Sequence, residues 1–399
     1  MEKLVRFTIL KVFIVSLFIS GCKQQQHTGI TDAGAQAQPV YSIVRQMQDF
    51  EWYETQAKAW KKEIDNGTTN TMAWVYWHEA NRMAAYFCDR NDEWKSKIGD
   101  YFIPIDSILK LAEKRIPNTF EYYFLKSQEM KIYEDFEYWT LKAQEIRPYD
   151  NLLLSNLLMN YLFKNDEESI ERVCKKWFES NEIPQDILIT LYNMLISLEE
   201  NAILLVHGDN DTFPCWVLQN AINIRPDVLV LNISLAGGMP SYRKNIFEEN
   251  GIKPLNNESD STYLMPQQLF KYLVENKKER PLYVSAFVSS EIYKEYDNNV
   301  YMTGLAFKYS PEPFNNLLTI RDNIENKFLL DFLKQRFHNT YAQSVVNRMN
   351  GGYLPAFRQL YNHYKQVGEK DKAKQIKELA RVVAQDSERM EEWLNYFKE

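Results

Sequence analysis

The spacing of apolar residues changes twice along this chain of 399 residues, and that change constrains the fold more than any other feature. From about residue 42 to 200, aromatic and aliphatic residues recur every three or four positions, which predicts amphipathic helices. From 201 to 312, short β-rich runs alternate with helical stretches, and helical spacing returns from 313 to 399. The pattern predicts a mostly helical α+β protein in which helices flank a small α/β, Rossmann-like domain.

The central region supplies the predicted strands. The runs AILLV, DVLVLNISL and PLYVSAFV, at 202–206, 227–235 and 281–288, favour strands, and helical stretches at 213–223 and 266–278 separate them. Residues 299–311 can add one more strand or a strand pair. Because strands and helices alternate, we expect a sheet with at least two parallel strands joined by right-handed crossovers.

The flanking regions contain helical hairpins. Residues 118–150 divide around a polar turn at 133–135, and residues 151–184 divide around a turn at 164–166. Each unit has about 34 residues and resembles a tetratricopeptide repeat, and residues 354–385 resemble it most closely. There the residues at the spacing of the repeat are Phe357, Leu360, Tyr364, Gly368, Ala373 and Ala380. The resemblance implies stacked helical pairs that bind a partner protein.

The N-terminus indicates where the protein resides. MEKLVRFTILKVFIVSLFISGC has the basic start, short apolar core and small exit residues of a secretory signal peptide. Its end resembles a bacterial lipobox, so we predict a signal peptide at 1–21, lipid on Cys22 and a flexible tether over 22–41. The alternative, an uncleaved membrane anchor, requires ~20 apolar residues, and this core is shorter. Lys23 without a following acidic run is compatible with an outer-membrane anchor that faces the periplasm.

Composition excludes some classes of function. Removing residues 1–21, which carry three basic residues and one acidic residue, changes the formal net charge from −7 to −9. An acidic chain without a dense basic block gives no support to nucleic-acid binding. Besides Cys22, the cysteines are Cys88, Cys174 and Cys215, which are widely spaced and form no CxxC motif. We therefore expect buried, inert thiols and no zinc knuckle.

The stretch HGDNDTFP, residues 207–214, follows the first predicted strand. In open α/β sheets, this edge is where ligands usually bind. One interpretation is purely structural: Gly208 makes a turn, Asp211 or Thr212 is the N-cap of the next helix, and Pro214 lies in its first turn. That interpretation leaves a second carboxylate and an amide unexplained. The candidate ligand-binding residues are His207, Gly208, Asp209, Asn210, Asp211 and Thr212.

Three kinds of ligand are compatible with the two aspartates. Asp209 and Asp211 can hold a divalent cation through oxygen ligands. Asp209-Asn210-Asp211 also matches the short D-x-D pattern that glycosyltransferases use to hold a metal and a sugar nucleotide. Finally, the carboxylates can accept hydrogen bonds from sugar hydroxyls or from the backbone of a partner.

The longer stretch NAILLVHGDNDTFPCWVLQNAINIRPDVLVLNISL, residues 201–235, resembles the soluble region of a family of large bacterial membrane proteins. The membrane part of that family resembles protein O-mannosyltransferases. Looser similarity continues through RPLYVSAF and VYMTGLAFKYSP, whereas AGGMPSYRKN at 236–245 departs from the pattern of the family. Because the glycosyltransferase-like part is missing here, the resemblance implies an accessory role in recognition within the cell envelope.

Binding is therefore the expected function, with a scaffold role that is accessory to envelope protein glycosylation or glycan handling. The alternative is a metal-dependent hydrolase or transferase, in which Asp209 and Asp211 hold the metal and His207 is the general base. Cys215 near a helix start can have a lowered pKa, although a packed thiol is the preferred interpretation. WHEANR, residues 77–82, lacks the second histidine of a zinc-protease motif.

Overall fold

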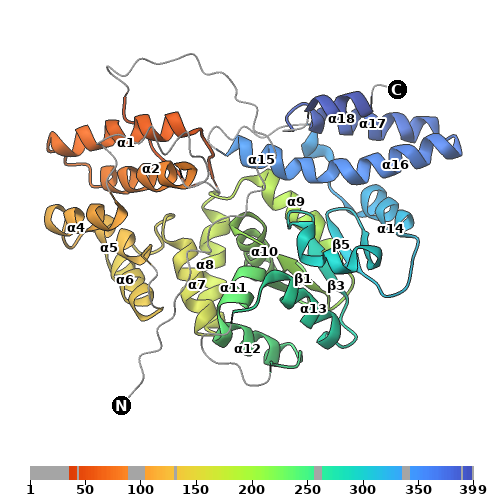
Figure 1. The fold of residues 1–399 in the computed structure, drawn as a ribbon, viewed down its shortest axis with the longest axis horizontal. Coiled ribbons are helices and arrows are strands. Elements are labelled where there is room, and N and C mark those ends of the chain that lie inside the picture. Colours follow the sequence, from red (N-terminus) through yellow and green to blue (C-terminus); the bar gives the residue numbers. More distant parts are fainter. Residues whose placement is uncertain are drawn as a thin grey trace. The chain divides into compact units, whose positions relative to one another are not determined.

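The computed structural model describes residues 36–42, 45–88, 104–129, 133–255, 263–334, 342–387 and 390–397 (Figure 1). The predicted signal peptide, Cys22 and the tether as far as residue 35 lie outside these residues. The described residues form two compact units, one up to Asn160 and one from Tyr161, and the border falls inside helix α7 (Leu154–Phe163). Among the described residues, no helix has the length and apolar character needed to cross a bilayer.

The regular secondary structure of the first unit, as far as its residues are described, consists of helices. Its helices before α7 are α1 (Phe50–Asp65), α2 (Met72–Cys88), α4 (Ile105–Arg115), α5 (Phe120–Ser127) and α6 (Tyr133–Ile146). Each helix packs against the next along the chain, and α2 also contacts α5. Residues just before α1 are held against it, because Trp60 Nε1 donates to the Gln38 carbonyl at 2.7 Å and Val40 is buried.

The turn between α5 and α6 lies earlier than predicted. Tyr133 begins α6, so the expected turn at 133–135 is wrong. Glu134 and Asp135 occupy the first turn of α6, where acidic side chains are favourable because they face the positive end of the helix dipole. An ion pair also joins α5 to the residue that follows α6: the Glu121 side chain is 1% exposed, and its Oε1 lies 2.6 Å from Nη2 of Arg147, whose side chain is 43% exposed.

The predicted turn at 164–166 is confirmed. It connects α7 to α8 (Glu167–Glu179). Asn165 has φ 52°, a left-handed conformation that Asn adopts more readily than most residues. Asp166 is the N-cap of α8, and its side chain accepts the backbone N–H of Ser169 at 3.1 Å.

The second unit contains a five-stranded mixed sheet. The strands are β1 (Ile203–Val206), β2 (Leu229–Asn232), β3 (Leu282–Ser285), β4 (Val300–Met302) and β5 (Ala306–Tyr309), in the order β2-β1-β3-β5-β4. β1 pairs in parallel with both β2 and β3, whereas β5 pairs antiparallel with β3 and β4. The parallel strands are buried at every position, as expected for strands covered on both faces. The predicted parallel strands and the strand pair at 299–311 are confirmed.

The second strand is shorter than predicted. It ends at Asn232, and residues 233–235, which the sequence assigned to a strand, begin α11 (Ile233–Gly238). Asn232 is the N-cap, because its Oδ1 accepts the backbone N–H of Leu235 at 3.0 Å. A side-chain acceptor at this position satisfies a helix N–H and so stabilises the change from strand to helix.

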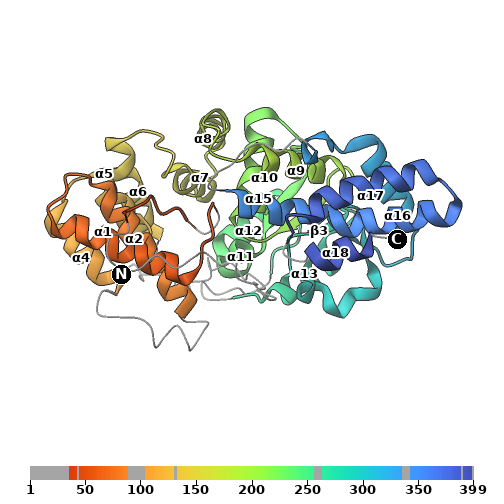
Figure 2. The same ribbon diagram turned by 90° about the horizontal axis from the view of Figure 1, so that it is seen from above.

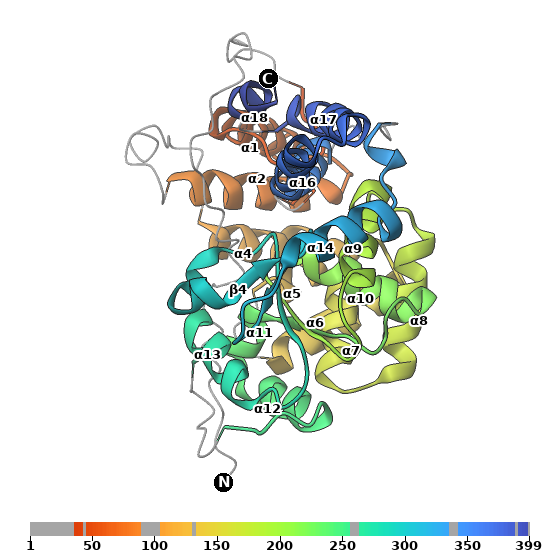
Figure 3. The same cartoon turned by 90° about the vertical axis from the view of Figure 1, so that its right-hand side faces the viewer.

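Helices connect the strands and cover them. α10 (Asp209–Ile222) connects β1 to β2, and α11, α12 (Pro240–Glu249) and α13 (Pro266–Asn276) lie between β2 and β3. α8 and α9 (Gln185–Ile196) pack against α10 (Figure 3). The stretch 236–245 contains the fully buried Arg243, whose Nη1 donates to the Gly237 carbonyl at 3.0 Å near the end of α11.

The C-terminal part is helical. It comprises α14 (Asn316–Asp322), α15 (Gln343–Asn350), α16 (Leu354–Val367), α17 (Lys370–Ala384) and α18 (Met390–Tyr396). α16 and α17 lie side by side as a hairpin (Figures 1 and 2). Gly368 ends α16 with φ 80°, a conformation that glycine adopts without strain. The residues expected to pack this hairpin are buried, namely Phe357, Leu360, Tyr364, Ala373 and Ala380.

Candidate ligand site at the carboxyl edge of the parallel strands

The three parallel strands end at one edge of the sheet. The register pairs Val206 at the end of β1 with Asn232 at the end of β2, and Ser285 ends β3 on the other side. The chain runs from β1 to its neighbour β2 and later crosses to its other neighbour β3, so the border between β1 and β3 is a topological switch point. In open α/β sheets, the crevice at such a point is the usual place for a ligand. The stretch 207–214 leaves β1 there.

The helix after β1 begins earlier than predicted. Gly208 is its N-cap, with φ 96° and ψ 178°, and α10 starts at Asp209. The expectation that Asp211 or Thr212 is the N-cap is therefore wrong, and Pro214 lies in the second turn. The backbone freedom of Gly208 allows the sharp turn that starts the helix directly after the strand. Gly208 has no side chain to cap the first turn, whose N–H groups have no acceptor within the helix.

Asp211 is the central side chain of the edge. It is 2% exposed, and its Oδ2 accepts the backbone N–H of His207 at 3.1 Å, so the carboxyl group folds back past the start of α10. Its Oδ1 is buried and has no hydrogen-bond partner within the described part of the chain. The Ser285 hydroxyl is near enough to favour the charged carboxylate, but it makes no hydrogen bond of normal geometry to Oδ1.

Burial controls the protonation of Asp211. Burial, with a smaller contribution from the charge of Asp209, raises the pKa of the carboxyl group to about 7. The N–H of His207 and the Ser285 hydroxyl act in the opposite direction. Burial also lowers the pKa of the His207 imidazole, which is therefore neutral at pH 7. Of these two groups, only Asp211 has a protonation state at neutral pH that differs from its ordinary one.

Thr212 has a structural partner. Its Oγ1 accepts a hydrogen bond from Asn232 Nδ2 at 2.8 Å, and both side chains are buried. The bond joins α10 to the end of β2. His207, Gly208, Asp209 and Asn210 are half-buried at the start of the helix. The structure therefore places four of the other predicted residues, 207–210, in the turn just before Asp211, whereas Thr212 contacts Asn232 at the end of β2.

Sequence reasoning did not identify Ser285 or Asn232 as part of this edge. Both end β-rich runs, at PLYVS and LVLN. Asn232 meets Thr212, and Ser285 meets Asp211, because of the strand order, which no local pattern gives.

The chemistry of a metal site is only partly present. Among the described residues, no group of three or more His, Cys, Asp or Glu side chains is placed to hold an ion. A hard cation takes six to eight oxygen ligands, and the turn offers the carboxylates of Asp209 and Asp211. Asp211 Oδ2 already accepts a backbone N–H.

The described thiols are inert. Burial raises the pKa of Cys215 well above its ordinary value, and the nearby Asp211 charge acts in the same direction. A lowered pKa at the helix start is therefore wrong for Cys215. Burial raises the pKa of Cys174 to about 12. His78 in WHEANR is buried, and burial lowers its pKa to about 4, so it is a neutral packed residue.

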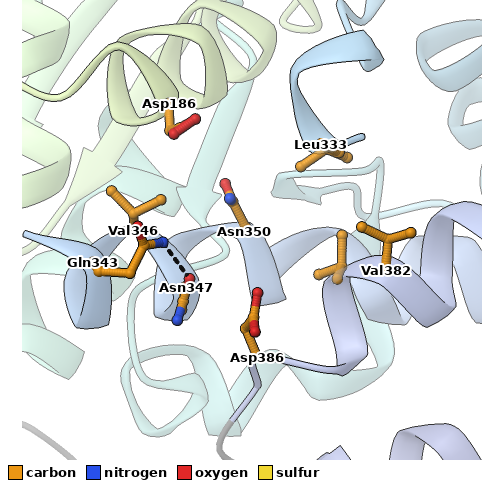
Figure 4. Close-up of a pocket in the computed structure, with 9 residues that line it drawn as sticks. Asp186, Leu333, Gln343, Val346, Asn347, Asn350, Val382 and Asp386 are labelled. Atoms are coloured by element: carbon orange, nitrogen blue, oxygen red, sulfur yellow. Dashed lines mark hydrogen bonds between the residues drawn. The ribbon is translucent and has the colours of Figure 1, made fainter. Parts of the chain in front are cut away.

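A small polar pocket lies between α9, α15 and the end of α17 (Figure 4). Asp186, Asn350 and Asp386 line it together with apolar residues. Three of its amide side chains already have partners: Gln343 Nε2 donates to Asn347 Oδ1 at 2.7 Å, and the Thr190 hydroxyl donates to Asn350 Oδ1 at 3.4 Å. The predicted site residues are not among those that line this pocket.

Comparison with protein families gives one match. Residues 189–240 match TMEM260-associated domain 2. The matched segment runs from α9 to the start of α12 and contains the whole stretch 207–214. It fits the resemblance to a family related to O-mannosyltransferases. No curated protein and no solved structure matches the chain.

Proposed function

We propose that this chain is a binding protein of the cell envelope that holds a ligand at the carboxyl edge of β1 and β3. The proposal is carried by the buried Asp211 Oδ1, which has no hydrogen-bond partner within the described residues. An unsatisfied buried acceptor costs ~1–3 kcal/mol, and a ligand that donates a hydrogen bond to it recovers that cost. The position of Asp211 at a topological switch point is where such a ligand is expected.

Thermal unfolding tests this proposal. Wild type, Asp211→Asn and the exposed control Asp297→Asn are heated with ligands grouped by charge: Ca²⁺, Mg²⁺, Mn²⁺ and Zn²⁺, inorganic phosphate, and neutral sugars. An amide supplies one acceptor oxygen where the carboxylate supplies two, so the variant loses one acceptor. A ligand that raises the midpoint of wild type and control, and not of Asp211→Asn, supports the proposal. If no ligand does so, the turn is simply the start of α10.

The helical parts provide a second binding surface in this proposal. Helices α1, α2, α4, α5 and α6 each pack on the next, and α16 and α17 form a hairpin with buried residues at the spacing of a tetratricopeptide repeat. Repeats of this kind bind other proteins along an extended surface. We propose that they hold a protein partner and that the chain is accessory to envelope protein glycosylation or glycan handling.

Site-specific photocrosslinking tests the scaffold role. A photoreactive residue replaces Tyr138, which is 53% exposed on α6, and the control carries it at the exposed Glu295 in the second unit. The expected result is one discrete adduct from position 138 and none from position 295. Equal labelling from both positions contradicts a specific surface on α6.

The lipid anchor on Cys22 places the protein in the envelope, facing the periplasm from the outer membrane. Metabolic labelling with a fatty acid tests the anchor in wild type, Cys22→Ala and Cys174→Ala. Label is expected in wild type and Cys174→Ala and is expected to disappear in Cys22→Ala. Label that remains in Cys22→Ala contradicts the anchor.

A catalytic role is the second candidate, because burial raises the pKa of Asp211 to about 7, where a carboxyl group can exchange a proton at neutral pH. In this role, Asp209 and Asp211 hold a divalent cation and His207 is the base of a hydrolase or transferase. Nitrophenyl phosphate and nitrophenyl glycosides with Mn²⁺ test for turnover. Turnover that disappears in His207→Gln while ligand binding remains distinguishes catalysis from binding.

A further inference from the structure

The chain binds part of its own N-terminal region by the backbone. The N–H of Gln38 donates to Oε1 of Gln56 at 2.7 Å, and Nε1 of Trp60 donates to the Gln38 carbonyl at 2.7 Å. Gln56 and Trp60 lie one turn apart on α1 and are 2% and 7% exposed. These two side chains, the Gln56–Trp60 clamp, therefore bind both polar groups of one peptide residue, as a neighbouring strand does in a sheet.

The clamp makes few demands on the sequence of the segment that it binds. Of residues 36–42, only Val40 is buried, whereas the side chains of Gln38 and Pro39 are exposed. Pro39 favours an extended backbone at the residue before it. The contact therefore requires an extended residue, a proline after it and an apolar residue after the proline.

Helix α2 holds the clamp in place independently of the bound segment. The Trp60 ring packs on the ring of Tyr76, with 5.0 Å between their centroids, and α1 packs against α2. A ring that is fixed by a neighbouring helix keeps its N–H aimed at the same point when the segment leaves. The clamp is therefore preorganised for another peptide of the same kind.

We infer that the Gln56–Trp60 clamp is a binding site for an extended segment of a partner protein, in which a proline is followed by an apolar residue. Residues 36–42 are then a competing ligand within the same chain. Hydrogen bonds to the main chain supply affinity, and the buried apolar side chain supplies selectivity. A tethered ligand competes at an effective concentration of about 1 mM, so the partner binds only when residues 36–42 leave. The inference goes beyond the ligand site proposed at β1 and β3 and does not depend on it.

Peptide binding to the full-length chain tests the inference. A fluorescent peptide with the sequence of residues 36–42, QAQPVYS, is titrated into wild type and Val40→Asp, and its anisotropy is measured. Val40→Asp removes the buried apolar side chain of the competing segment and leaves the clamp intact. The variant should therefore bind the peptide at least about tenfold more tightly than wild type.

Two tryptophan variants show whether the peptide binds at the clamp. In the Val40→Asp chain, Trp60→Phe removes the N–H donor and keeps an aromatic ring, so it should weaken binding about fivefold. Trp52→Phe, in the first turn of the same helix, is the control and should leave the affinity unchanged. A peptide with aspartate in place of its valine should not bind.

Each contrary result overturns the inference. It fails if Val40→Asp binds the peptide no more tightly than wild type, or if Trp60→Phe and Trp52→Phe have the same effect. Should Val40→Asp not fold, hydrogen exchange of wild type decides. Excess peptide should speed the exchange of the Gln38 N–H, because that N–H loses its bond to Gln56 when the segment is displaced. Unchanged exchange overturns the inference.

Discussion

The two units differ in the partner that they provide for a buried carboxylate. In the helical unit, Glu121 is 1% exposed and forms an ion pair with Arg147 at 2.6 Å. In the α/β unit, Asp211 is 2% exposed and is held by a backbone N–H, with one oxygen unsatisfied within the described residues. A paired buried charge contributes to holding two helices together, whereas an incompletely satisfied one remains sensitive to protons and to ligands. Equal burial therefore does not imply an equal role.

The pH dependence of stability gives the largest predicted effect. The pKa of Asp211 is raised from 3.8 to about 7 in the folded chain, so the folded state binds its proton more tightly than the unfolded state does. Its contribution to stability is present below pH 4 and is lost as the pH rises to about 7, with a total of about 4 kcal/mol. The measurement is the free energy of unfolding of wild type and Asp211→Asn from pH 4 to 8. Wild type should lose stability relative to the variant across this range.

Asp227 provides a control of opposite sign. The Arg225 guanidinium lowers its pKa to about 2, so its contribution is present above pH 4 and is lost as the pH falls towards 2. Asp227→Asn should therefore differ from wild type most at neutral pH. If the stability difference between wild type and variant changed with pH in the same direction for Asp227→Asn and for Asp211→Asn, the two sites would not differ as proposed.

Breaking the ion pair of the helical unit gives the next largest effect. Arg147→Ala leaves the buried Glu121 carboxylate without its partner, and we expect a loss of roughly 3 kcal/mol in urea unfolding. The control is Arg172→Ala, because Arg172 and Glu168 form an exposed pair at 3.6 Å. That pair should contribute below ~1 kcal/mol. If both variants lost a similar free energy of unfolding, the burial of Glu121 would not make its ion pair more stabilising than an exposed one.

The backbone at Gly208 gives a smaller effect. Gly208→Ala puts a side chain at φ 96° and ψ 178°, and we expect a loss of about 2 kcal/mol from backbone strain. Gly351 is the matched control: it has φ −55° and, as at Gly208, no protein atom lies within 4 Å of an added Cβ. Gly351→Ala should leave the unfolding midpoint nearly unchanged. If both substitutions are neutral, the turn is less constrained than its dihedral angles indicate.

Helix caps should show the smallest effect and no difference between the units. Asp49 caps α1 through the N–H of Trp52 at 2.8 Å, and Asp166 caps α8 through the N–H of Ser169 at 3.1 Å. Each change to Ala should cost ~1 kcal/mol in urea unfolding. A much larger loss at one cap would show that its unit unfolds separately and at lower stability.

Local sequence patterns predicted much of the fold. The runs ILLV and LYVS gave β1 and β3 because continuous apolar residues favour buried strands, and Gly368 marked the end of α16. The patterns failed where a single side chain or backbone conformation decides the boundary. Asn232 starts α11 inside an apolar run, and Gly208 starts α10 before either residue expected to cap it.

The sequence predicted where the candidate site lies, but it did not identify all of the residues that form it. The turn 207–210 is local, so its place after β1 could be inferred from sequence. Ser285 lies far along the chain and comes beside Asp211 only through the order of β1 and β3. The packing of α8 on α10 could not be predicted from the spacing of apolar residues either. An apolar helix face shows that the helix packs against something, but it does not specify the partner.

The strand order also sets the sequence of events during synthesis. β1 pairs with β2 through nearby residues, as in Ile203 with Leu229, whereas the pairing with β3 joins Ile203 to Leu282. Local pairs form before distant ones because closing a longer loop costs more entropy. We expect β1, α10 and β2 to associate while β3 is still being made. The edge around Asp211 is thus completed late, when β3 with Ser285 pairs with β1. A nascent chain that stops before β3 should contain the turn 207–210 but lack the strand that lies on its other side.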